Sequence, residues 1–165
     1  MKRYLILIIL GFAFIMQTCT KDEPVIGEAF SHVKGISDTW VLTHVKQSDE
    51  IAESEPLDVT DVMVGGDPSM MVFNEANRTY TLTSGSSVQF IPGSGTWAFD
   101  DEKYPSNVVV SSGGNSYTLN LQKPVREKVD DVLEFKYIRP IGDCAVLENN
   151  KVGAVGYIYT YQRKK

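Results

Sequence analysis

The strongest constraint on the fold is a series of short apolar runs separated by residues that favour chain reversal. Apolar and polar side chains alternate through residues 116–122 and again through 132–138. A period of two puts the apolar side chains on one face of a strand, which is typical of antiparallel sheets with one packed and one wet side. Gly113-Gly114-Asn115 lies between the runs 108–111 and 116–122 and predicts a tight hairpin.

Similar runs extend along most of the chain, and helical periodicity is missing after the first two dozen residues. The expected strands cover residues 38–46, 59–64, 70–73, 79–83, 88–91, 96–99, 108–111, 116–122, 132–138 and 155–162. Many short strands with few helices indicate a barrel or a sandwich. We predict an all-β fold, a small antiparallel meander β-barrel, because most connections are short enough for neighbouring strands to pair. A β-sandwich is the alternative.

The longer links are expected to form loops at the rim of the barrel. These links are residues 100–107, 123–131 and 139–154.

The first residues form a separate segment with a function in export. Lys2 and Arg3 precede thirteen mostly apolar residues, Tyr4 to Met16, which are followed by polar ones. As a helix those thirteen residues would span about 20 Å, which is too short for a hydrocarbon core of roughly 30 Å. A basic start, a short apolar run and a small or polar cleavage region predict a secretory signal peptide over residues 1–18.

Cys19 follows this segment and resembles the lipid-modified cysteine of bacterial lipoproteins. The resemblance implies cleavage before Cys19 and acyl chains, of the palmitate type, that attach the protein to a membrane. Lys21, Asp22 and Glu23 resemble the signal that sends such lipoproteins to the outer face of the outer membrane. We therefore expect a lipid-anchored outer-membrane protein exposed at the cell surface. Display on the periplasmic face is an alternative, and so is an ordinary cleaved signal with an incidental cysteine.

Charge and cysteine content exclude several classes of protein. The formal net charge is −5, and removing Lys2 and Arg3 with the signal peptide makes the remaining chain more acidic. An acidic surface disfavours nucleic acid and anionic headgroups, so membrane attachment is expected through the lipid alone. If Cys19 carries lipid, Cys144 has no partner for a disulfide. We interpret Cys144 as a small buried or half-buried side chain.

The remaining chain divides into a tether and one domain. Residues 19–36 mix charge, Pro24 and glycines with little periodicity, and we expect a lipidated tether there. Residues 37–165 are enough for a single domain with its own core.

A second resemblance covers nearly all of residues 36–165. It is carried by Trp40 within 39–42, by Gly95-Thr96-Trp97-Ala98-Phe99 with Asp100-Asp101 and Tyr104-Pro105, by 117–119, by 133–137 and by 157–161. In this order the segments resemble the lipocalin-like domains of unknown function on lipoproteins of Gram-negative gut anaerobes. The resemblance implies a small β-barrel on a lipid anchor and supplies no catalytic residues.

Catalytic and metal-binding patterns are missing from the sequence. There is no G-x-S-x-G motif, and the histidines are His32 in the expected tether and His44 in the middle of a strand. The acidic clusters 100–102 and 130–131 lack the spacing of a calcium loop and are expected to be solvated. We predict a protein that is not an enzyme and that has no metal and no cofactor.

The aromatic residues are the best candidates for recognition. In a barrel, inward rings can line a cavity for an apolar or sugar ligand, and outward rings can stack on a glycan or a protein. Core packing is the preferred interpretation of Trp40 and Trp97. Tyr157, Tyr159 and Tyr161 share one face of an expected strand and are the first candidates for a recognition surface.

These observations favour a non-enzymatic binding or accessory module whose ligand is a glycan, a small apolar molecule or an envelope protein. The first alternative is a structural or interaction subunit of the envelope with a solid core and no ligand. The second is an enzyme inhibitor or an enzyme with an unrecognised site. A carrier predicts a cavity lined by inward rings, whereas a solid barrel predicts no cavity of useful volume.

Overall fold

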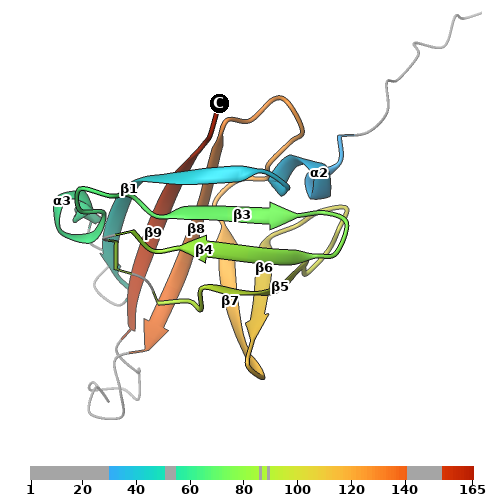
Figure 1. Cartoon of the computed structure of the whole chain (residues 1–165). Helices are drawn as coiled ribbons and strands as arrows, with labels where there is room; N and C mark the ends of the chain where they lie inside the picture. The colour runs from blue at the N-terminus through green and yellow to red at the C-terminus, as the bar shows by residue number, and fades with distance from the viewer. Residues whose placement is uncertain (1–29, 51–54, 86, 89, 141–153) are drawn as a thin grey trace, which may run out of the picture.

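The computed structural model describes residues 30–50, 55–85, 87–88, 90–140 and 154–165, and most of them form one closed barrel (Figure 1). Its eight antiparallel strands are β1 (Thr39–Asp49), β3 (Met70–Asn74), β4 (Thr79–Thr83), β5 (Ser94–Phe99), β6 (Asn107–Ser112), β7 (Asn115–Leu121), β8 (Val132–Pro140) and β9 (Ala154–Arg163). Each strand pairs with its neighbour in this order, and β9 returns to pair with β1. The predicted all-β meander barrel is confirmed, and the β-sandwich alternative is wrong.

Residues 59–64 were expected to form a strand, and this prediction is wrong. A two-residue strand, β2 (Leu57–Asp58), pairs with β1 and leads into the short helix α3 (Thr60–Met63). The Asp58 carboxylate accepts a hydrogen bond from the Thr60 amide at 2.9 Å, and the Thr60 hydroxyl accepts one from the Val45 amide at 3.0 Å. Residues 59–64 therefore pack beside β1 and bury Met63, and they do not form a further strand of the sheet.

The strand expected at 88–91 is also missing from the described residues. This segment belongs to the connection between β4 and β5, and its apolar side chains Phe90 and Ile91 pack against the barrel core. These side chains are half-buried against the core, and the described backbone of the segment stays outside the sheet.

The barrel interior is filled by alternate residues of the strands. Its buried apolar residues are Trp40, Leu42, Val45, Met71, Phe73, Tyr80, Leu82, Trp97, Val108, Val110, Leu119, Leu133, Phe135, Tyr159 and Tyr161. In β1 the register shifts between Leu42 and His44, which leaves Thr43 as an extra residue opposite β9. This bulge brings Val45, rather than His44, to the core side.

One end of the barrel is covered by the helix α2 (His32–Ile36). Ile36 is 1% exposed, and its carbonyl accepts a 2.8 Å hydrogen bond from the indole nitrogen of Trp40. The connection from β7 to β8 covers the same end, and its Val125 carbonyl lies 3.1 Å from His32 Nδ1. The folded part of the chain thus includes residues that were expected in the tether.

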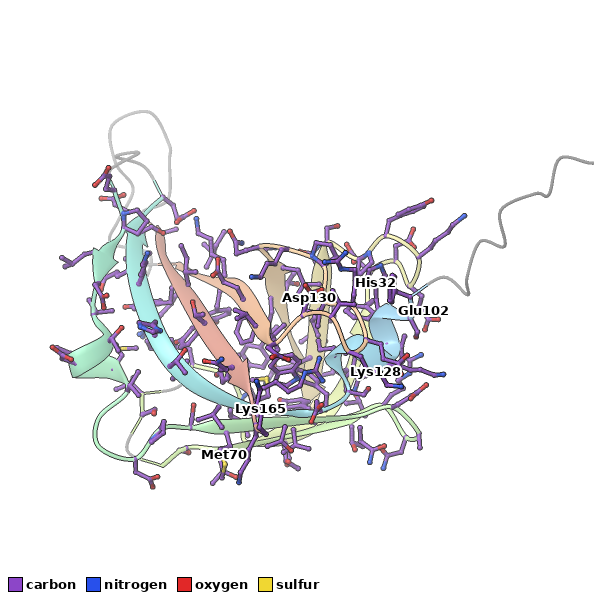
Figure 2. The ribbon with its side chains drawn as sticks, turned by 90° about the horizontal axis from the view of Figure 1, so that it is seen from above. His32, Met70, Glu102, Lys128, Asp130 and Lys165 are labelled. Carbon is purple, nitrogen blue, oxygen red and sulfur yellow. The ribbon has the colours of Figure 1, made fainter. Side chains whose placement is uncertain are left out.

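Arg163, in the last strand, joins the elements of this covered end. Its guanidinium carbon lies 4.5 Å from the Trp40 ring centroid, and it donates to the carbonyls of Gly35 and Asp130 at 3.1 and 2.9 Å. It also forms an ion pair with Asp38. Figure 2 shows the labelled residues of α2, the β5–β6 loop and the β7–β8 connection together at this end. The opposite end receives the β4–β5 connection.

Close packing of β5 against β6 makes Gly95 a sensitive position. A Cβ atom there would collide with the Ser111 carbonyl oxygen and lie 3.0 Å from a ring carbon of Tyr80. We expect Gly95→Ala to lower the free energy of unfolding by about 1–3 kcal/mol in urea titrations, because overpacking forces the strands apart. Gly66→Ala is the matched control, since nothing lies within 4 Å of its added Cβ. Equal effects of the two variants would contradict the packing described here.

Candidate functional site

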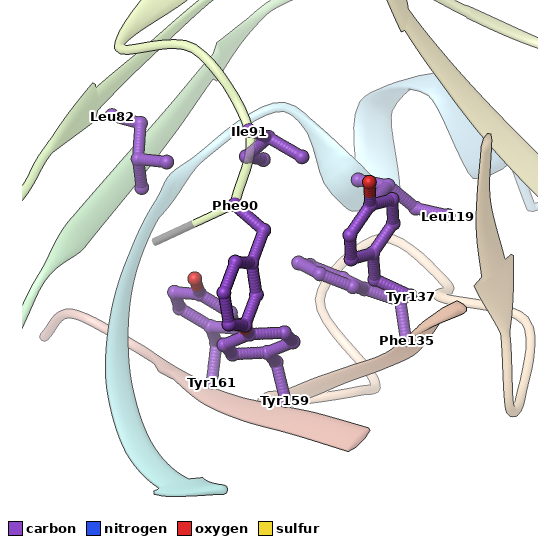
Figure 3. A pocket seen from close by; sticks show the side chains of 8 residues that line it. All are labelled: Leu82, Phe90, Ile91, Leu119, Phe135, Tyr137, Tyr159 and Tyr161. Atoms are coloured by element: carbon purple, nitrogen blue, oxygen red, sulfur yellow. The ribbon is translucent and has the colours of Figure 1, made fainter. Parts of the chain in front are cut away.

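The candidate site is a small pocket inside the barrel, near the end opposite α2 (Figure 3). Strand residues form most of its wall, and the β4–β5 connection contributes the remainder. The lining residues are Leu82, Phe90, Ile91, Leu119, Phe135, Tyr137, Tyr159 and Tyr161. The free volume of the pocket is only about 10 Å³, which is roughly the space that one water molecule needs. The pocket is therefore nearly filled by its own side chains.

Phe90 is the side chain that fills the mouth of this pocket. Its ring centroid lies 4.7 Å from that of Tyr157 and 6.2 Å from that of Tyr137, with the latter pair stacked at 24°. The guanidinium carbon of Arg139 lies 5.0 Å from the same centroid. Strand residues thus form a slot of the size of one aromatic ring, and a half-buried residue from a connection occupies it.

Two tyrosines of β9 form the inner wall. Tyr159 and Tyr161 are 6% and 2% exposed, and the ring centroid of Phe135 lies 5.7 and 5.4 Å from theirs. Burial raises the pKa of both phenols well above the ordinary value for tyrosine.

The hydroxyl of Tyr159 is buried and has no hydrogen-bond partner among the described residues. A buried hydroxyl without a partner costs about 1–3 kcal/mol relative to a satisfied one. The inner wall therefore includes one residue, Tyr159, whose buried hydroxyl is unsatisfied within the described part of the chain.

The tryptophans chosen from the sequence lie elsewhere in the core. Trp40 is fully buried beneath α2. Trp97 is 2% exposed and donates through its indole nitrogen to the Asn74 carbonyl at 3.2 Å, with Phe73 and Phe99 packed edge-on at 5.5 and 5.4 Å. Both are packing residues, and neither lines the pocket.

The three tyrosines of β9 do share one face, as expected, and that face is turned into the barrel. Tyr159 and Tyr161 line the pocket, and Tyr157 is half-buried at its mouth against Phe90. The sequence did not identify Phe90 as the residue that fills the pocket, because its apolar neighbours suggested a strand. One sequence feature could have indicated a connection here: residues 88–91 lie between Gly85 and Pro92-Gly93, which favour chain reversal.

The expected lipidation residue Cys19 and the expected export signal Lys21, Asp22 and Glu23 lie outside the described residues. Cys144 does as well.

The acidic cluster at 100–102 organises the β5–β6 loop. The Asp100 carboxylate accepts hydrogen bonds from the hydroxyl and amide of Ser106 and from the amide and side chain of Asn107, at 2.7 to 3.0 Å. These bonds hold the pKa of Asp100 well below its usual range. Within the described residues, no group of three or more His, Cys, Asp or Glu side chains is arranged to hold a metal ion.

No helix in the described part of the chain is long and apolar enough to cross a membrane. Comparison with known proteins adds no family: no family model matches the chain, and no curated protein matches it. The resemblance to lipocalin-like lipoprotein domains therefore stays a prediction.

Burial of Tyr159 and Tyr161 predicts a loss of stability at high pH. Above about pH 10 the unfolded chain releases its phenol protons, whereas the folded protein keeps these two. The free energy of unfolding should therefore fall as the pH rises above 10, and urea titrations at several pH values measure this slope. The double variant Tyr159→Phe/Tyr161→Phe should show a smaller slope. An unchanged slope would mean that other groups cause the loss.

Proposed function

We propose that this protein is a non-enzymatic, lipid-anchored barrel of the outer membrane, displayed at the cell surface, that binds a small apolar molecule inside the barrel, at the pocket that Phe90 fills. The observation that carries the proposal is the slot over the paired residues Tyr137 and Tyr157 of β8 and β9, which the loop residue Phe90 fills. Apolar and aromatic walls with a few polar atoms are typical of ligand pockets.

The two parts of the pocket differ in how firmly they are held. Tyr137 and Tyr159 belong to strands that pair along their whole described length, so moving them would break the barrel. Phe90 lies in a connection outside the sheet. A ligand that replaces its ring leaves the ladder hydrogen bonds intact. Binding then depends on the difference between the contacts of the ligand and those of Phe90.

The inward tyrosines favour an apolar ligand over a glycan or an envelope protein, because rings that stack on such partners must be accessible at the surface. The alternative function, a structural or interaction subunit with a solid core, is supported by the small free volume of about 10 Å³. The two functions predict different behaviour of the wild type: a carrier binds a small apolar molecule that displaces the Phe90 ring, whereas a solid core does not, and the variant Phe90→Ala shows whether the pocket can hold such a molecule at all.

The variant Phe90→Ala tests the pocket. Removing the ring should leave an apolar cavity that accepts toluene, as other dry cavities lined by Leu, Ile and Phe accept benzene-sized molecules. We expect toluene to bind at least about tenfold more tightly to the variant than to the wild type, because no ring competes for the slot. Chemical shifts of the Leu82, Ile91 and Leu119 methyl groups report occupancy.

Val88→Ala is the matched control, because Val88 lies in the same connection, is 44% exposed and does not line the pocket. It should bind toluene as the wild type does. Circular dichroism verifies that each variant is folded. A folded Phe90→Ala protein that shows no toluene-dependent shifts would rule out the ligand pocket and favour the solid-core function.

The membrane anchor is tested separately through Cys19. In a Gram-negative host, Cys19→Ala should move the protein from the membrane fraction to the soluble fraction and remove the acyl mass from its N-terminus, because acyl chains supply the membrane affinity. Cys144→Ala should keep both. Retention of Cys19→Ala in the membrane fraction would contradict the lipid anchor.

A further inference from the structure

We infer that the site selects a neutral, single-ring aromatic molecule with one oxygen substituent, bound in place of the Phe90 ring with its oxygen hydrogen-bonded to the Tyr159 hydroxyl. The inference rests on the proposed function and adds the chemical class of the ligand.

The ring is inferred from the present occupant of the slot. Tyr137 stacks on Phe90 at 24°, Tyr157 packs against it at 4.7 Å, and Arg139 lies over it at 5.0 Å. All three contacts suit a flat π-system, and the guanidinium gains from the negative face of an aromatic ring. An aliphatic ligand of equal volume would lose the contact with Arg139.

The size limit follows from the volume. Beside Phe90 only about 10 Å³ is open to a water-sized sphere. A ligand therefore has the space of one phenyl ring plus that of about one small substituent. A single six-membered ring with a hydroxyl or carbonyl group fits this limit, whereas fused rings exceed it.

The oxygen is inferred from the unpartnered Tyr159 hydroxyl. Apart from Phe90, four lining residues carry no polar side-chain atom, and the remaining three, Tyr137, Tyr159 and Tyr161, each carry a hydroxyl. The Tyr159 hydroxyl is enclosed by the protein and lacks a partner among the described residues. A hydroxyl can donate or accept, so either a phenol or a carbonyl oxygen satisfies it. A purely apolar ring would leave it unpaired, and sites of this kind discriminate against such analogues.

Neutrality follows from the same lining. Among the residues that the structure describes, no acidic or basic side chain lines the pocket, and an unpaired charge is costly to bury. Arg139, which lies over the Phe90 ring, belongs to the mouth and is exposed.

The test compares 4-methylphenol with toluene, which share a ring and a methyl group and differ by one hydroxyl. Both are titrated into Phe90→Ala and into Phe90→Ala/Tyr159→Phe, with the Leu82, Ile91 and Leu119 methyl shifts as the readout. The measured quantity is the ratio of the toluene to the 4-methylphenol dissociation constant, and comparing this ratio between the two variants cancels the difference in hydration of the two molecules. We expect Tyr159→Phe to lower this ratio about tenfold, as the loss of one buried hydrogen bond implies.

Phe90→Ala/Tyr161→Phe is the matched control, because Tyr161 is a buried tyrosine on the same strand and the same pocket wall. It should leave the ratio within about twofold of the Phe90→Ala value. The wild type should show the same order of preference with weaker binding of both molecules.

Three other outcomes would each contradict a different part of the inference or of the proposed function. If both molecules bind and Tyr159→Phe leaves the ratio unchanged, the inference about the oxygen is wrong and the proposed function stands. If Tyr161→Phe lowers the ratio instead, the assignment to Tyr159 is wrong. If neither molecule binds to a folded Phe90→Ala protein, the proposed function is wrong and the inference with it.

Discussion

The pairing of β1 with β9 closes the barrel, and the stacking of Arg163 on Trp40 lies at one end of this seam. It brings a cation of the last strand over an aromatic ring of the first strand at 4.5 Å. Hydrogen bonds from the same guanidinium to the Gly35 and Asp130 carbonyls attach α2 and the β7–β8 connection to this seam. Because a guanidinium has five donors in a fixed plane, one side chain can join four segments of the chain at once.

This arrangement divides the interior into two unlike halves. Under α2 the core is tightly packed, and Trp40 and Trp97 both donate to backbone carbonyls at 2.8 and 3.2 Å. Toward the other end the interior is lined by tyrosines and closed by Phe90, and a hydroxyl lacks a partner within the described residues. Buried polar atoms without a hydrogen-bond partner among the described residues occur in both halves: Arg163 Nε lies beside Trp40, and the Tyr159 hydroxyl lies in the pocket wall.

The regular strands could be predicted from the sequence, because their alternation follows directly from a packed and a wet face, as in β7 and β8. The assignments at 59–64 and 88–91 were wrong because apolar side chains of a connection, such as Met63 and Phe90, can pack against the core without backbone pairing. The helix α2 has five residues, which is too few for a periodic signal. For the site, the sequence indicated the tyrosines of β9, but it could not reveal the slot that Phe90 fills or the missing partner of Tyr159, since both depend on residues distant in the chain.

The pairing of β1 with β9 joins residues 39–49 to residues 154–163, nearly the full length of the folded chain. Such a topology has a high contact order and closes slowly, because a very large loop must form before this pairing can add any stability. During synthesis the eleven-residue strand β1 is made early, whereas β9, with which it pairs, is made last. Until then every earlier strand belongs to an open sheet, whose long unpaired edge can recruit the same edge of a neighbouring nascent chain.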